Sequence, residues 1–252
     1  MRKLEDIVYG ELQEEHLLDV YLPDDDNVKG AFVFFHGGGM ERGSKRGAYK
    51  FAGYLAERGI ATVSVNYRMY PDYAYPDFIY DAAKSVRWTV DFMRKEYNCN
   101  EVYVGGSSAG GYISMMLCFD RRYYDSVGIS NADISGYMHD AGQPTAHFTV
   151  LKYKEIDHRR IIVDETAPLY YIGLEEKYPP MRFIVSDNDI KNRYEQTMLV
   201  LSTMKHFGYE GYDHILMHGK HTEYVGKFDE NEQSIFGQML YDFFERARKL
   251  NG

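Results

Sequence analysis

Short apolar runs alternate with longer amphipathic stretches along most of this chain. The short runs predict strands near residues 5–10, 16–22, 31–36, 61–67, 101–105, 127–132, 181–186 and 213–217. The longer stretches predict helices near residues 47–58, 77–97, 109–119, 193–207 and 231–249. Alternating strands and helices predict an α/β fold. We expect a mostly parallel eight-stranded sheet with helices on both faces, in which the first strands form an antiparallel edge.

The helical pattern is clearest between residues 77 and 97. A single helical face there carries five apolar side chains, namely Phe78, Ala82, Val86, Val90 and Met93. Such a stripe is typical of a helix that packs on a sheet. We find no repeat and no low-complexity linker, so residues 1–252 are predicted to form a single domain.

Residues 136–180 do not follow the alternation. This segment has little periodicity but many aromatic residues and histidines, namely Tyr137, His139, His147, Phe148, Tyr153, His158, Tyr170 and Tyr171. Long irregular segments in compact domains often have a function. We expect residues 142–165 to form a small lid over part of a substrate pocket. The alternative is an ordered surface excursion that makes no substrate contact.

Composition narrows the range of partners and compartments. The 252 residues carry a net charge of −9 with both signs dispersed, so no basic stripe suggests a nucleic-acid partner. No apolar run approaches the ~18 residues of a membrane span, and no apolar leader is visible at the N-terminus. Cys99 and Cys118 do not suggest a disulfide framework. We expect a cytoplasmic protein without a membrane partner, which could form a homo-oligomer.

The stretch Gly106-Ser107-Ser108-Ala109-Gly110 lies between a predicted strand and a predicted helix. Gly-x-Ser-x-Gly alone would arise by chance in roughly one chain in ten. Between a strand and a helix, however, the pattern is typical of a nucleophile elbow, where a sharp reversal exposes the serine hydroxyl. We expect Ser108 to have a strained backbone, with the N-terminus of the following helix aimed at the same point.

Three glycines follow another predicted strand, in His36-Gly37-Gly38-Gly39. Bare backbone N–H groups at such a strand end could stabilise the oxyanion that forms during acyl transfer. One alternative is a flexible turn. A second alternative, a phosphate-binding loop, is disfavoured because no Lys-Ser or Lys-Thr pair follows at the required spacing.

Two aspartates and two histidines compete for the remaining catalytic roles. Asp187 and Asp189 follow the predicted strand at 181–186, and His218 and His221 follow the predicted strand at 213–217. A carboxylate in such a position can orient a histidine that activates a serine. The chain order Ser, Asp, His is typical of α/β-hydrolases.

These motifs resemble esterases of the α/β-hydrolase fold, within the hormone-sensitive-lipase-like group. The resemblance runs from about Val20 to about Phe244. It rests on the glycine motif, the serine motif, Asn66-Tyr67-Arg68 and Gly219-x-His221. We expect no helical N-terminal cap of the kind found in larger members, because strand-like Val20-Tyr21-Leu22-Pro23 comes early in the sequence. It is most similar to compact bacterial carboxylesterases, including esterases that remove acetyl or feruloyl groups.

The resemblance implies a role for each motif residue. Ser108 is the expected nucleophile. Asp189 is favoured as the acid because it lies three residues past the small residue Ser186, and His221 is favoured as the base because it follows Gly219 by two. The acid loop departs from the usual pattern, since it reads Asp189-Ile190-Lys191 without the common Pro and Leu. The expected oxyanion donors are the N–H groups of Gly38, Gly39 and Ala109. His36 is expected to be structural.

The sequence thus predicts a serine carboxylesterase that acts on short-chain or aromatic acyl esters, with acetyl and feruloyl groups on sugars among the candidate substrates. The chemistry requires no cofactor, and the histidine spacing does not suggest a metal site. Two alternatives are an amidase or formamidase of the kynurenine formamidase type and a non-catalytic ligand-binding protein. The aromatic loop at 67–78 is either a stacking platform for substrate or a loop whose tyrosines pack on the body.

Overall fold

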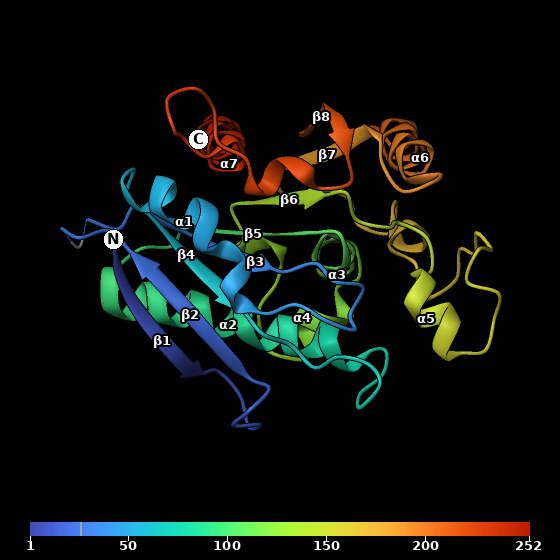
Figure 1. The fold of residues 1–252 in the computed structure, drawn as a ribbon, viewed down its shortest axis with the longest axis horizontal. Coiled ribbons are helices and arrows are strands. Elements are labelled where there is room, and N and C mark those ends of the chain that lie inside the picture. The colour runs from blue at the N-terminus through green and yellow to red at the C-terminus, as the bar shows by residue number, and fades with distance from the viewer. Residues whose placement is uncertain (26) are drawn as a thin grey trace.

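A single mixed sheet organises the structure, a computed structural model that describes residues 1–25 and 27–252. Eight strands of the described chain follow the order β1-β2-β4-β3-β5-β6-β7-β8 (Figure 1). They are β1 (Arg2–Val8), β2 (Leu17–Leu22), β3 (Gly30–Phe35), β4 (Ile60–Val65), β5 (Val102–Ser107), β6 (Gly136–Asp140), β7 (Met181–Asn188) and β8 (Tyr212–Lys220). β1 and β2 pair antiparallel and β2 pairs antiparallel with β4, whereas all other pairs are parallel.

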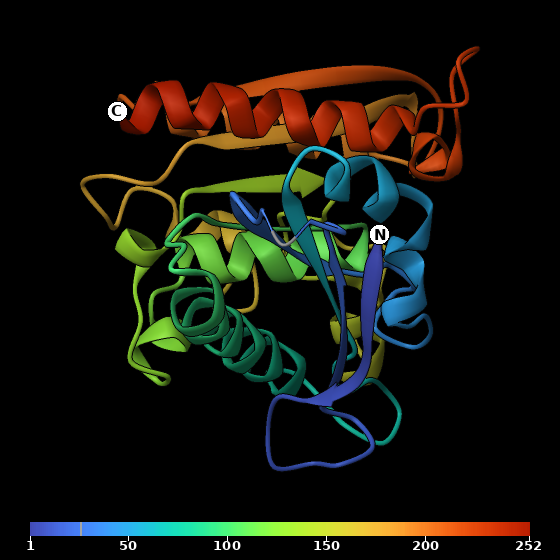
Figure 2. The same cartoon turned by 90° about the vertical axis from the view of Figure 1, so that its left-hand side faces the viewer.

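Helices cover both faces of this sheet. α1 (Tyr49–Ala56) and α7 (Ile235–Asn251) lie on one face, and α2 (Asp77–Tyr97) and α3 (Ala109–Phe119) lie on the other (Figures 1 and 2). α6 (Arg193–His206) packs on β7, and its buried residues join the same core layer as those of α2 and α3. The short elements are α4 (Arg122–Asp125), α5 (Phe148–Tyr153), η1 (Lys45–Ala48), η2 (Asn131–Asp133), η3 (Pro168–Tyr171) and η4 (Glu223–Gly226). The predicted α/β architecture is confirmed.

Strand β3 shows how the sheet divides the core into two layers. Side chains alternate across a strand, so Val33 and Phe35 join the core beneath α2 and α3 while Phe32 and Phe34 join the core beneath α1 and α7. All six residues of β3 are buried. This explains the continuous apolar run in the sequence, because a parallel strand covered on both faces has no solvent-exposed side.

The predicted strand at 127–132 is wrong. There the chain forms a turn and then η2, whose start is fixed by a capping box between Ser130 and Asp133. The strand beside β5 is β6, at Gly136–Asp140. β6 was hard to predict because it contains the polar residues His139 and Asp140. Both are buried and hydrogen-bonded; for example, His139 Nδ1 lies 2.9 Å from Ser114 Oγ.

Most other predicted elements agree with the structure within a few residues. α2 and α3 match the predicted bounds, and all five residues of the predicted apolar stripe on α2 are buried. α7 begins at Ile235, later than predicted. None of the described helices is long and apolar enough to cross a membrane.

The segment at 142–165 contains α5 and lies beyond the edge of the sheet where β6 ends (Figure 1). Its first part, through Leu151, is largely buried, and the remainder is largely exposed. The role of this segment as a lid remains a prediction.

Candidate active site

A strained turn presents Ser108 between β5 and α3. Ser108 has φ 57° and ψ −112°, a conformation that L-residues rarely adopt. Its N–H donates to Asp140 O at 2.8 Å, which fixes the turn against β6. The neighbouring glycines are required by space, since a Cβ at Gly106 would lie 2.5 Å from Phe35 O and one at Gly110 would lie 1.9 Å from the same atom. The predicted strained elbow is therefore present.

The side chains of Ser108, His221 and Asp189 form a hydrogen-bonded chain. Ser108 Oγ lies 2.8 Å from His221 Nε2, and His221 Nδ1 lies 2.5 Å from Asp189 Oδ1. The three residues come from the end of β5, the loop after β8 and the loop after β7. Because these strands are parallel, their carboxyl ends lie at one edge of the sheet. This arrangement suits proton transfer from a serine to a histidine.

Asp187 and His218 form a second pair that does not reach the serine. His218 Nδ1 lies 2.6 Å from Asp187 Oδ2, but the His218 side chain is 90% exposed. By contrast, the Asp189 side chain is 1% exposed and that of His221 is 21% exposed. Of the competing residues, the structure thus brings Asp189 and His221 to Ser108 and leaves the other pair at the surface.

Hydrogen bonds keep Asp189 ionised despite its burial. Burial by itself would raise the pKa of Asp189, but the hydrogen bond from His221 and those from the backbone N–H groups of Ile190 and Ser186 lower the pKa below its ordinary value. Ser186 Oγ also donates to Lys220 O at 3.0 Å, which connects the acid loop to the histidine loop. The carboxylate can therefore stabilise a protonated His221.

Asp140, at the end of β6, is a residue that the sequence analysis missed. Its carboxylate is fully buried and accepts hydrogen bonds from Ser107 Oγ, at 2.5 Å, and from Tyr224 OH. Burial raises the pKa of Asp140 to about 6, opposed by these hydrogen bonds and by the charge of His221. Asp140 therefore connects the residue before the nucleophile with the turn that follows the histidine. Its position at a strand end was a signal, but the misplaced strand concealed it.

The glycine loop after β3 passes beside the nucleophile. A Cβ at Gly37 would lie 3.2 Å from Ser108 Cβ. Gly38 and Gly39 have φ values of 115° and 67°, and a Cβ at Gly38 would lie 2.0 Å from Arg42 O, so this position requires glycine. Both glycines border the same pocket as Ser108. Ala109 is the first residue of α3, where helix N–H groups lack intrahelical partners.

His36 supports this loop from below. Its ring stacks on Tyr67 with centroids 4.4 Å apart, and its Nδ1 lies 2.7 Å from Gly37 O. Burial lowers the pKa of His36 to about 4, so the ring is neutral at physiological pH. Tyr67 OH donates to His36 O at 2.7 Å. These contacts are those of a structural residue, as expected from the resemblance.

The pocket in front of Ser108 has a volume of about 680 Å³. Its walls include the glycine loop, His221, Phe148 of α5 and Ile190 of the acid loop. None of the described residues of the 67–78 loop borders this pocket. Tyr70 instead stacks on Tyr153 at 4.0 Å, and Tyr75 OH donates to Glu165 O at 3.0 Å. The structure thus favours packing over a stacking platform for this loop.

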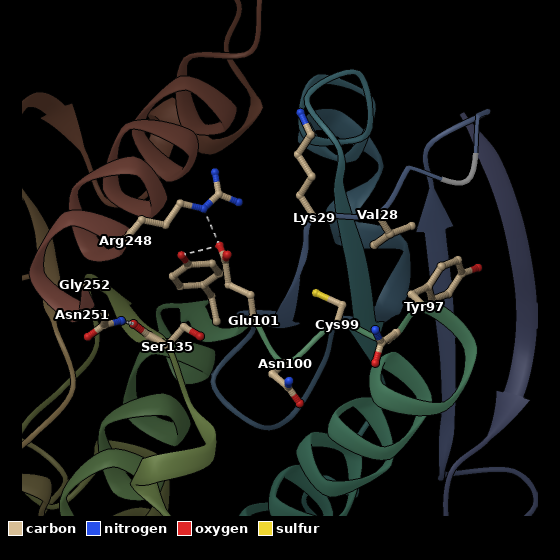
Figure 3. A pocket seen from close by; sticks show the side chains of 12 residues that line it. Val28, Lys29, Tyr97, Cys99, Asn100, Glu101, Ser135, Arg248, Asn251 and Gly252 are labelled. Carbon is tan, nitrogen blue, oxygen red and sulfur yellow. Dashed lines mark hydrogen bonds and ion pairs between the residues drawn. The ribbon is translucent and has the colours of Figure 1, made fainter.

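A second pocket, of about 590 Å³, lies at the opposite edge of the sheet, where β3, β5 and β6 begin (Figure 3). Two of its charged groups pair with each other, since Arg248 Nε donates to Glu101 Oε1 at 2.7 Å, and Tyr103 OH donates to the same oxygen at 2.6 Å (Figure 3). Across residues 1–25 and 27–252, no group of three or more His, Cys, Asp or Glu side chains is arranged to hold a metal ion.

Known proteins with similar sequences are named as esterases. A family model described as BD-FAE matches residues 18–126. The probable carboxylic ester hydrolase LipM of Mycobacterium tuberculosis is 36% identical over 137 residues, which are 51% of this chain and 31% of LipM. The probable isoprenylcysteine alpha-carbonyl methylesterase ICMEL2 of Arabidopsis thaliana is 32% identical over 126 residues, which are 49% of this chain and 30% of that protein. The matched region thus spans about a third of these relatives.

Solved structures match over nearly the whole chain. A truncated carbohydrate esterase from gut microbiota superposes with a TM-score of 0.77, covering 98% of this chain and 97% of that chain at 19% identity. The chain has the α/β-hydrolase fold. The fold predicted from the sequence is therefore confirmed, and the sequence relatives bear out the resemblance to α/β-hydrolase esterases.

Proposed function

We propose that the protein is a serine carboxylesterase that hydrolyses short-chain or aromatic acyl esters. The observation that carries the proposal is the chain of two hydrogen bonds from Asp189 through His221 to Ser108, which lies at the wall of an open pocket. An intact chain of this kind argues against a non-catalytic binding protein. The names of the sequence relatives favour esters over amides.

In the proposed reaction, His221 takes the proton of Ser108 Oγ as the oxygen attacks the ester carbonyl. Asp189 holds the tautomer of His221 that accepts this proton and stabilises the imidazolium. The N–H groups of Gly38, Gly39 and Ala109 bind the oxyanion, and each such donor typically contributes about 3 kcal/mol to the barrier reduction. His221 then protonates the leaving alcohol, and water hydrolyses the acyl-enzyme by the same steps in reverse.

Acyl groups of two to four carbons are the expected substrates. The glycine loop and the side chains of Glu41 and Arg42 line the pocket together with four large apolar residues, namely Phe34, Phe148, Ile190 and Val225. A longer chain gains about 0.8 kcal/mol per buried methylene only where walls cover it. We therefore expect kcat/KM to fall from butyryl to octanoyl nitrophenyl esters. A continued rise to decanoyl esters would contradict this substrate range.

Covalent labelling tests the proposal most directly. A fluorophosphonate should add to Ser108 in the protein as isolated, and mass spectrometry of the peptides should locate the added mass at this residue. The loss of nitrophenyl acetate hydrolysis should be proportional to the fraction of protein that is labelled. The Ser107→Ala variant is the matched control, since Ser107 is adjacent but bonded to Asp140. Labelling at another residue, or full hydrolysis after complete labelling, would refute the assignment.

A further inference from the structure

A pocket adjoining the catalytic pocket has an unusual charge. It has a volume of about 330 Å³ and shares Phe148 and Ile190 as walls with the pocket in front of Ser108. Four cationic residues and one histidine line it, namely Arg159, Arg160, Lys191, Arg193 and His158, and none of its lining residues is acidic. In a chain of net charge −9, such a concentration of positive charge is local and attracts anions.

Most of these cations have no anionic partner. Arg160 and Lys191 are exposed, and within the described part of the chain neither side chain forms an ion pair or a hydrogen bond. Arg159 differs, since its guanidinium pairs with Asp157 at 2.6 Å. Arg160 and Lys191 are therefore available to a ligand, whereas the charge of Arg159 is already neutralised.

Arg193 is the most buried of the four cationic residues, and it forms no ion pair with any described residue. Its side chain is buried, with 3% of the residue exposed, and its guanidinium donates only to neutral acceptors, namely Ala141 O and Gln143 Oε1. Burial of a charge without a counter-ion raises the free energy of the charged form. Burial therefore lowers the pKa of Arg193 to about 10, although the negative charge of Asp189 opposes this shift. A carboxylate in the pocket would relieve that cost.

Gln196, on the same helix α6 as Arg193, also lines this pocket. Its Oε1 is buried and has no hydrogen-bond partner among the described residues. Gln196 thus adds a polar residue to the cationic lining of the pocket. In the pocket at the opposite edge of the sheet, by contrast, Arg248 already pairs with Glu101.

We propose that this cationic pocket is a substrate subsite for a carboxylate, so that the protein prefers esters carrying an acidic group a few atoms from the scissile carbonyl. The planar guanidinium of Arg160 can bind a carboxylate through two parallel hydrogen bonds, and Lys191 adds a point charge. Phe148 and Ile190 would hold the connecting atoms between Ser108 and the subsite. The inference rests on the proposed esterase function.

Monoesters of dicarboxylic acids test the subsite. The substrates are nitrophenyl hemiesters of succinate, glutarate, adipate and suberate, each compared with a neutral nitrophenyl ester of equal length. The ratio of the two kcat/KM values, acidic over neutral, should exceed one and should have a single optimum in chain length. An Arg160→Gln/Lys191→Gln double variant should lower this ratio about fivefold or more, from roughly two- to threefold per exposed charge. Arg159→Gln, the matched control, should leave the ratio within twofold. A second series, acetyl esters of hydroxy acids, carries the carboxylate on the alcohol part of the ester instead of the acyl part. Comparing the two series shows on which side of the scissile bond the subsite binds the carboxylate.

Direct binding keeps this test independent of catalysis. Adipate binding, measured by calorimetry on the wild-type protein, should weaken in the double variant and at high salt, but not in Arg159→Gln. If neutral esters are not hydrolysed and a phosphonate does not label Ser108, the proposed function fails while adipate binding still tests the subsite. The subsite is refuted if adipate does not bind and if neither the hemiesters nor the acetyl esters of hydroxy acids are preferred over neutral esters in a way that depends on Arg160 and Lys191.

Discussion

The two Asp–His pairs at the carboxyl ends of β7 and β8 offer a controlled test of the catalytic assignment. Asp189→Asn places an amide against His221 Nδ1, where the structure has a carboxylate at 2.5 Å. The amide N–H₂ favours the tautomer that cannot accept the proton of Ser108, and the imidazolium loses its counter-ion. Comparable replacements lower kcat by about 10⁴, which corresponds to roughly 5.5 kcal/mol of barrier. We expect a loss of 10³ to 10⁴.

Asp187→Asn makes the same chemical change in the neighbouring pair. The Asp187 side chain is 42% exposed and its partner His218 is 90% exposed, so water screens the interaction and no contact reaches Ser108. The expected loss is less than about threefold. Steady-state kcat and KM with nitrophenyl acetate, together with the urea midpoint of each variant, separate catalysis from stability. Equal losses in the two variants, or a larger loss for Asp187→Asn, would refute the assignment.

Three further predictions follow from individual contacts. Ser108→Ala should lower kcat by about 10⁴ to 10⁶ with an unchanged urea midpoint, and retention of a tenth of the activity would contradict the proposed nucleophile. Gly106→Ala should lower the melting temperature, because its Cβ would meet Phe35 O at 2.5 Å, whereas Gly53→Ala in α1, where a Cβ meets nothing within 4 Å, should raise it by about 1 to 4 °C. The raised pKa of Asp140, about 6, means that its stabilising contribution is complete below its unfolded pKa near 4 and is lost as the pH rises through 6. The amide of an Asp140→Asn variant does not titrate, so the free energy of unfolding of the variant should rise relative to that of the wild type by up to about 3 kcal/mol between pH 4 and pH 7. Urea titrations at several pH values measure this difference, and a difference that stays constant with pH would contradict the prediction.

Local patterns made most of the fold and the candidate triad predictable. The continuous apolar run of β3 and the stripe on α2 follow directly from burial on two faces and on one face. The order of Ser108, Asp189 and His221 could be read because each residue follows a strand of one parallel sheet. The choice of Asp189 over Asp187 came from spacing and resemblance, and the structure adds the physical reason, which is that only Asp189 turns inward from the end of β7.

Tertiary contacts explain what the sequence could not reveal. The cationic pocket joins residues near 160 with residues near 193, and no local pattern relates the two segments. The burial of Arg193 is likewise invisible in a sequence, where an arginine at the start of a helix looks exposed. The tyrosines of the 67–78 loop were equally compatible with stacking on a substrate or on the body until their partners, such as Tyr153, were known.

The misplaced strand shows how function can hide an element from sequence analysis. β6 carries His139 and Asp140 in a buried position, where apolar residues would normally be expected. Asp140 uses its carbonyl oxygen to hold Ser108 N–H and its carboxylate to hold Ser107 and Tyr224, which lie on either side of the candidate site. An apolar residue at this position would make β6 easier to predict. It would also remove the side-chain contacts that tie the nucleophile's turn to the turn after the histidine.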